Sequence, residues 1–178
     1  MRQALRSTLF SVVVAGLALA LLTGASLTLT PTRAQTQVGE KNGDWTFQCQ
    51  AISAKETICA ITQVFANQET RQRVLVLTIR TLGIEKKLKL VANAPLGIYL
   101  PEPIVATIDD GAQLTFAWQT CTQQGCEATA EINDESRAAM KAGTRMQIAF
   151  KAQASSNPVT FNASLKGVIE GLIEIGAE

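Results

Sequence analysis

The sequence predicts a mainly β fold in a single domain: an antiparallel β-sandwich or barrel-like sheet, stapled by disulfides, with one short helix and a C-terminal helix. Three observations predict it. Short strand-like runs recur at regular spacing between turn residues. Four cysteines follow an N-terminal segment that has the pattern of a secretory signal peptide. Helical periodicity is confined to two stretches late in the chain.

The N-terminal segment has the three-part pattern of a secretory signal peptide. Two arginines precede an uncharged, mostly apolar run from Leu9 to Leu22, and a small-residue boundary follows just before Gln35. We therefore expect a signal peptide over residues 1–34 and one β domain over residues 35–178. The uncharged stretch continues weakly to Thr30, so an uncleaved membrane anchor is the alternative.

All four cysteines lie in the predicted domain, at Cys49, Cys59, Cys121 and Cys126. An even number behind a signal peptide is typical of disulfides. Three pairings are open, and the simplest joins sequence neighbours, Cys49–Cys59 and Cys121–Cys126. The four residues between the last two cysteines suit a hairpin that places them opposite each other. These spacings fit a zinc site or a redox-active dithiol poorly.

The first four strands are predicted from their apolar patterns. Residues 45–50 alternate apolar and polar side chains, as a half-buried strand does. Residues 58–65 are rich in Ile, Val, Thr and Phe. Residues 73–81 are apolar on both faces, which indicates a central strand, and residues 86–91 alternate leucine with lysine.

Five more strands are predicted at 104–109, 114–119, 126–132, 145–151 and 159–163. The first two flank Asp110-Gly111, a dipeptide favoured in tight hairpins. The third places Glu127 and Glu131 on one face and small apolar residues on the other. Trp45 and Trp118 both lie on apolar strand faces, so we expect them in the core.

Two helices interrupt the strands. Residues 134–143 begin with acidic residues and end at a glycine, which predicts one or two helical turns. Apolar residues between Leu165 and Ile173 follow helical spacing, with Ser164 as the expected N-cap and Gly176 as the expected stop. This second helix is expected to cover one end or edge of the sheets.

Composition limits the chemistry. The chain has no histidine, which excludes Ser-His and Cys-His nucleophilic pairs and imidazole metal sites. A net charge of +1, together with 5% aromatic residues, disfavours nucleic-acid binding. Three arginines lie in residues 1–34, so the predicted domain keeps 13 of the 16 basic residues against 15 acidic ones, a net charge of −2. No nucleophile, dinucleotide or phosphate-loop motif is present, and no cofactor or metal is expected.

Two groups of residues remain as candidates. Arg80, Lys86, Lys87 and Lys89 form the basic cluster, a candidate interaction face for an anionic surface or, alternatively, a solvated strand edge that resists edge-to-edge pairing. Four carboxylates are the alternative candidates for acid–base chemistry or ligand binding: Asp109, Asp110, Glu127 and Glu131. Turn chemistry for the two aspartates and the polar side of a strand for the two glutamates are the preferred explanations.

The chain resembles the invasion-associated locus B (IalB) family of secreted Gram-negative proteins. The residues that carry the resemblance run from about residue 42 to the end: Gly43-Asp44-Trp45, Cys49, Cys59, Pro95-Leu96-Gly97-Ile98-Tyr99-Leu100, Ile108-Asp109-Asp110-Gly111, Cys121 to Cys126 and Ser164-Leu165-Lys166-Gly167. Val168 stands where the closing motif usually has an aromatic residue. The resemblance implies an exported protein of the periplasm or outer membrane, and it implies a link to host-cell entry in some relatives. It supplies no catalytic residues.

Three hypotheses follow. The first is an exported, non-enzymatic binding module in the periplasm, associated with the outer membrane or secreted, whose partner is a protein or envelope component. The second is a periplasmic small-ligand carrier or carboxylate-using enzyme. The third is a structural envelope protein in peripheral contact with the outer membrane through Lys86, Lys87 and Lys89. The sequence leaves the oligomeric state, the strand order and any invasion role open.

Overall fold

The computed structural model describes residues 39–177, all within one compact unit, so the predicted signal peptide over residues 1–34 lies outside the described residues. The strands are β1 (Lys41–Asn42), β2 (Trp45–Ser53), β3 (Glu56–Ala66), β4 (Arg73–Leu82), β5 (Lys87–Ala94), β6 (Val105–Ile108), β7 (Gln113–Thr115), β8 (Ala117–Thr122), β9 (Gly125–Glu131), β10 (Arg145–Phe150) and β11 (Val159–Ser164). The helices are α2 (Asp134–Ala142) and α3 (Val168–Glu174).

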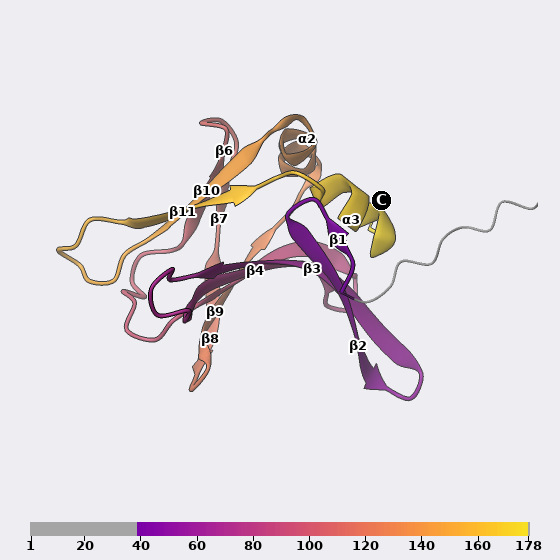
Figure 1. Cartoon of the computed structure of the whole chain (residues 1–178), viewed down its shortest axis with the longest axis horizontal. Coiled ribbons are helices and arrows are strands. Elements are labelled where there is room, and N and C mark those ends of the chain that lie inside the picture. The colour runs from indigo at the N-terminus through magenta and orange to yellow at the C-terminus, as the bar shows by residue number, and fades with distance from the viewer. Residues whose placement is uncertain (1–38, 178) are drawn as a thin grey trace, which may run out of the picture. The chain divides into compact units, whose positions relative to one another are not determined.

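The strands form two antiparallel sheets that face each other (Figure 1). The large sheet has the order β1-β2-β3-β4-β5-β9-β8, and the small sheet has the order β11-β10-β6-β7. Neither sheet closes on itself, so the predicted sandwich is confirmed and the barrel-like alternative is wrong. The small sheet and α3 lie on the same side of the large sheet (Figure 1).

The core is the layer between the sheets. One row of cross-strand neighbours shows how the large sheet fills it: Phe47, Ile61, Ile79, Leu90 and Ala130. All five are at most 5% exposed. Strand residues alternate between the two faces of a sheet, so the apolar set predicted from the alternation lies on one face. The rings of Phe65 and Phe161, 5.6 Å apart, join the two sheets.

Both disulfides join directly opposed residues of neighbouring strands. Cys49 pairs with Cys59 across β2 and β3, and Cys121 pairs with Cys126 across β8 and β9. The simplest of the three pairings is therefore confirmed. Each bridge staples one long hairpin of the large sheet.

The predicted strand 114–119 is two strands in two different sheets. Leu114 lies in β7 of the small sheet and Trp118 in β8 of the large sheet. Between them Phe116 is 1% exposed, and its backbone N–H donates to the Ile104 carbonyl at 2.9 Å. The apolar alternation is real, but the chain turns from one sheet into the other at Phe116.

The short helix is confirmed, and so is the glycine that ends it. The Asn133 side chain caps α2 by accepting from the Ser136 N–H at 2.8 Å, and Gly143 follows its last residue. Gly176 adopts φ +70° just beyond α3, so the predicted stop of the C-terminal helix is confirmed too.

The predicted cap of the C-terminal helix is wrong. Ser164 is the last residue of β11, and its carbonyl accepts from Trp45 Nε1 at 2.9 Å and from Gln63 Nε2 at 3.2 Å. The helix begins after Gly167, which has φ +87° and offers no side-chain cap. Tertiary hydrogen bonds from the large sheet thus hold Ser164 in the strand.

Candidate interaction surfaces

The large sheet has a second face that carries most of the predicted basic cluster. We call it the outer face, and its middle row is Thr46, Thr62, Thr78, Val91 and Thr129. Among the described elements, those that cover the large sheet contact its other face: Gly171 of α3 lies against Ile61, and Phe161 of β11 lies against Phe65.

The structure splits the predicted basic cluster. Arg80 and Lys89 are cross-strand partners on the outer face, and Lys87 lies on the same face two residues before Lys89. Lys86 belongs to the turn before β5, has φ +49°, and lines a different pocket. Only three of the four predicted residues therefore share one surface.

Carboxylates neutralise two of these cations. Glu131 accepts a hydrogen bond from Lys89 at 2.7 Å and lies 3.8 Å from the Lys87 ammonium. Glu85 lies 3.2 Å from the same Lys87 nitrogen. The hydrogen bond from Lys89 is the main reason that the pKa of Glu131 is lowered from its ordinary value. The outer face is thus a surface of mixed charge. Such a surface suits a protein partner better than it suits a polyanion.

A hollow of about 750 Å³ lies beside these ion pairs on the outer face. Its lining includes Glu127, Glu131, Lys89 and the turn residue Ile84, which is fully exposed. Two of the four predicted carboxylates therefore share a concave surface. The pKa of Glu131 moves downward there, whereas the acid–base hypothesis expects a raised value.

Asp109 and Asp110 lie in the turn between β6 and β7, both with positive φ, and neither lines that hollow. The Asp109 carboxylate accepts from the Thr144 N–H at 2.7 Å, the Thr144 hydroxyl at 3.1 Å and the Arg145 N–H at 3.1 Å. The hydrogen bond from the Thr144 backbone is the main reason that the pKa of Asp109 is lowered from 3.8. Asp109 ties the β6–β7 turn to the loop that follows α2.

Asp109→Asn is expected to destabilise the protein at neutral pH and to weaken its acid sensitivity. The folded pKa lies below the unfolded value, so this contribution is present above about pH 4 and is lost as the pH falls through the folded pKa. Urea unfolding at pH 7 and at about pH 3 measures the effect. The difference between wild type and variant should shrink at the lower pH.

Asp110→Asn is the matched control for that measurement. The Asp110 carboxylate makes one exposed ion pair, with Arg145 at 3.2 Å, so we expect little change in stability at either pH. Equal losses in the two variants would contradict the role given to Asp109.

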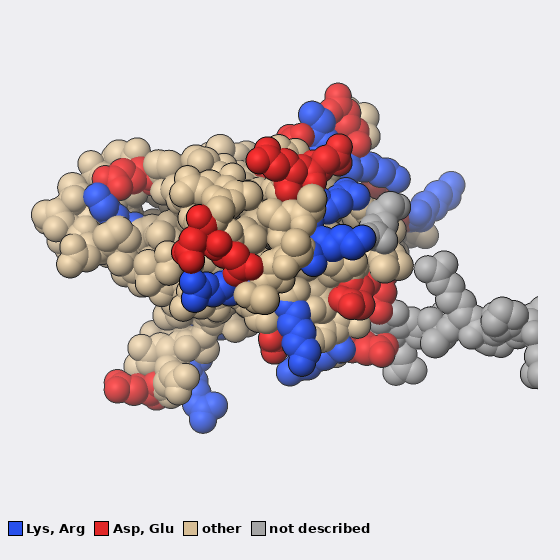
Figure 2. All heavy atoms as spheres, turned by 90° about the horizontal axis from the view of Figure 1, so that it is seen from above, with Lys and Arg blue, Asp and Glu red and all other residues tan. Residues whose placement is uncertain are grey.

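The small-sheet side carries interspersed acidic and basic side chains (Figure 2). Glu102, which precedes β6, and Lys151, which follows β10, form an ion pair of 2.9 Å. Charge on the visible surface is therefore mixed rather than gathered into one large basic or acidic area.

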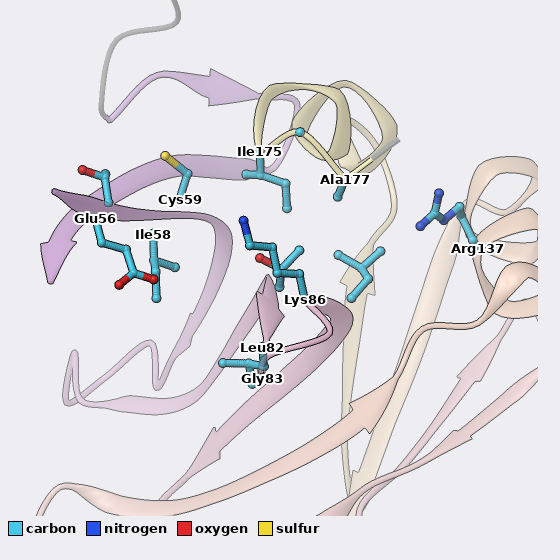
Figure 3. A pocket seen from close by; sticks show the side chains of 13 residues that line it. Glu56, Ile58, Cys59, Leu82, Gly83, Lys86, Arg137, Ile175 and Ala177 are labelled. Atoms are coloured by element: carbon cyan, nitrogen blue, oxygen red, sulfur yellow. The ribbon is translucent and has the colours of Figure 1, made fainter.

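A second pocket, of about 720 Å³, lies at the open end of the sandwich beside the C-terminal end of α3 (Figure 3). Its lining combines Lys86 and Arg137 with apolar side chains and the Cys59 end of a disulfide. Sequence reasoning missed this site. Sequence proximity groups Lys86 with Lys87 and Lys89, and no local pattern links Lys86 to Arg137.

A family model described as invasion associated locus B (IalB) protein matches residues 45–176, from the start of β2 to just beyond α3. The chain belongs to this family. This member is 34% identical over 134 residues to the invasion protein B homologues of two Brucella abortus strains, 2308 and biovar 1 strain 9-941, covering 75% of this chain and 76% of each relative. The resemblance predicted from the motifs is confirmed.

The fold of this IalB-family protein also matches a solved structure. The crystal structure of invasion associated protein b from Bartonella henselae superposes with a TM-score of 0.67 at 22% identity, covering 79% of this chain and 96% of that one. Within residues 39–177, no helix has the length and apolar character needed to cross a bilayer, and no group of three potential metal-ligating side chains occurs.

Proposed function

We propose that this member of the IalB family is an exported, non-enzymatic binding protein of the Gram-negative envelope, periplasmic or associated with the outer membrane. Its outer face contacts a protein or envelope component. Two disulfides in the domain support export, because such bridges persist in oxidising compartments. The signal-peptide pattern of residues 1–34 points the same way.

One observation carries the choice of surface: within residues 39–177, the elements packed on the large sheet contact a single face of it. The other face presents the partly exposed Thr46, Thr78 and Thr129, paired charges, a hollow and the half-exposed Val64. The threonine hydroxyls and the ion-paired side chains of Lys87, Lys89 and Glu131 can make hydrogen bonds to a partner, and Val64 can make an apolar contact. This mixture resembles the composition of non-obligate protein interfaces.

The candidate carboxylates support binding over catalysis. The Asp109 carboxylate accepts three hydrogen bonds within the fold, and Glu131 makes ion pairs with two lysines. Both have lowered pKa values, whereas a general acid needs a raised one. The names of the Brucella and Bartonella relatives refer to invasion. We therefore include in this proposal that binding through the outer face contributes to host-cell entry.

Site-specific photo-cross-linking tests the surface. A photoreactive amino acid is placed at Val64 on the outer face of the full chain, produced in its own bacterium, and the envelope fractions are irradiated and analysed by mass spectrometry. We expect a discrete adduct in the periplasmic or outer-membrane fraction. Lys87→Gln with Lys89→Gln should reduce its yield, because these charges flank the hollow.

Thr160 is the matched control position, since it is an exposed strand residue on the outward side of the small sheet. No adduct from Val64, or the same adduct in equal yield from Thr160, would refute the outer face as the binding surface. Recovery of the protein from the cytoplasmic fraction alone would refute export.

A further inference from the structure

The pocket at the end of the sandwich has the chemistry of a ligand site. Its volume of about 720 Å³ falls in the range of small-molecule sites, roughly 300–1,000 Å³. It is built from the β2–β3 and β4–β5 hairpins, the start of α2 and the residues that follow α3. Figure 3 shows side chains from all of these elements converging on it.

Apolar side chains form the walls of this pocket. Ile58, Leu82 and Leu88 come from the large sheet. Ile175 and Ala177 come from the residues that follow α3. Leu88 is 6% exposed and belongs to the core, so one wall is continuous with the core itself. An alkyl or acyl chain placed here would leave water for an apolar surface, which is favourable.

Two cations face this apolar space. Arg137 reaches toward it from α2, and Lys86 reaches into it from the β4–β5 turn (Figure 3). Lys86, which has φ +49°, lines this pocket, whereas Lys87 and Lys89 line the hollow on the outer face. Within residues 39–177, neither cation forms an ion pair with a carboxylate.

The guanidinium of Arg137 is incompletely satisfied. Its Nε is shielded from solvent and has no hydrogen-bond partner within residues 39–177. A buried donor without an acceptor is costly, and the guanidinium is a delocalised planar cation that suits carboxylates and phosphates. An anion bound at this group would restore the electrostatic stabilisation that burial removes. Glu56 is the single acidic residue of the described lining, so the pocket has a net positive charge.

We propose that this pocket binds a small amphiphilic anion, with its carboxylate or phosphate head group between Arg137 and Lys86 and its alkyl chain against Leu88 and Ile175. The site is distinct from the outer face and from the four carboxylates named in the sequence. It gives the protein a ligand-binding capacity in addition to the surface contact proposed above, and the two can be tested independently.

Calorimetric titration of the full chain with three probes of equal chain length tests the site: sodium octanoate, mono-octyl phosphate and neutral 1-octanol. We expect at least one anion to bind clearly more tightly than octanol, and the preferred anion identifies the head group. Arg137→Gln and Lys86→Gln should each weaken that anion roughly tenfold. Glu56→Gln should bind it somewhat more tightly, because a nearby negative charge is removed.

Lys87→Gln is the matched control, because this adjacent lysine lines the hollow on the outer face and should leave anion affinity unchanged. Ala177→Trp fills the pocket without touching either cation's charge and should abolish binding, which keeps the test decisive if Arg137→Gln does not fold. Equal affinity for octanol and both anions, no binding of either anion, or equal weakening by Lys87→Gln would overturn the proposal. Photo-cross-linking from Val64 should be unaffected by Ala177→Trp, whichever way the titration comes out.

Discussion

Gly167→Ala is expected to lower the free energy of unfolding by roughly 3 kcal/mol or more, enough to prevent accumulation of folded protein. Gly167 has φ +87°, where an L side chain is strained. A Cβ there would overlap the Asn42 carbonyl oxygen and lie 2.7 Å from the Gly43 nitrogen. Because the obstacle is backbone rather than a flexible side chain, the junction of β11 and α3 would have to separate from the β1–β2 turn.

Gly83→Ala separates the two causes of the loss expected for Gly167→Ala, which are backbone strain and overlap with the Asn42 backbone. Gly83 has φ +77°, but a Cβ there would meet nothing within 4 Å, so only backbone strain of about 1–2 kcal/mol is expected. Urea unfolding of both variants, with yield of folded protein as a second readout, makes the comparison. Losses of equal size would show that the close approach of Gly167 to Asn42 does not matter.

Trp45→Ala is expected to cost about 3–5 kcal/mol, the range for a fully buried large aromatic side chain. Trp45 is 0% exposed, and its indole N–H donates to the Ser164 carbonyl at 2.9 Å. Removal of the ring opens a cavity between the two sheets and leaves that carbonyl with only Gln63 as a side-chain donor. Thermal and urea unfolding followed by circular dichroism measure the loss.

Trp118→Ala is the matched control, since Trp118 also donates its indole N–H to a backbone carbonyl, that of Glu102 at 3.1 Å. Trp118 is only partly buried, so its loss should be clearly smaller. If Trp45→Ala does not fold, Trp45→Phe should fold and retain most of the stability. A larger loss from Trp118→Ala than from Trp45→Ala would contradict the assignment of Trp45 to the centre of the core.

Much of the fold could be predicted because its signals are local. The alternation in residues 45–50 and 126–132 assigns each side chain to a face without reference to any other strand. The same holds for α2, whose acidic start and glycine stop lie within one short segment. The cysteine pairing was also local, since each bridge spans a single hairpin.

The candidate sites were less predictable. Lys86, Lys87 and Lys89 are neighbours in sequence, but a left-handed residue at the turn directs Lys86 into one pocket and leaves the other two on the outer face. Alternation over the predicted strand 86–91 separates Lys86 from Lys87 and Lys89, but it cannot place Lys86 in a pocket with Arg137. Asp110-Gly111 correctly predicted a turn, but the hydrogen bonds from Thr144 to Asp109 come from a distant segment.

The sequence by itself predicted most of the strands, α2, the existence and stop of the C-terminal helix, the simplest disulfide pairing and the family, because periodicity and motif spacing depend on neighbouring residues. Only the tertiary structure decided where the chain changes sheets at Phe116, why Gly167 must be glycine, and that Arg137 and Lys86 line one pocket. Each of these depends on the close approach of segments far apart in the chain. Such contacts are selected by packing and hydrogen-bond satisfaction over the whole domain, and no local pattern encodes them.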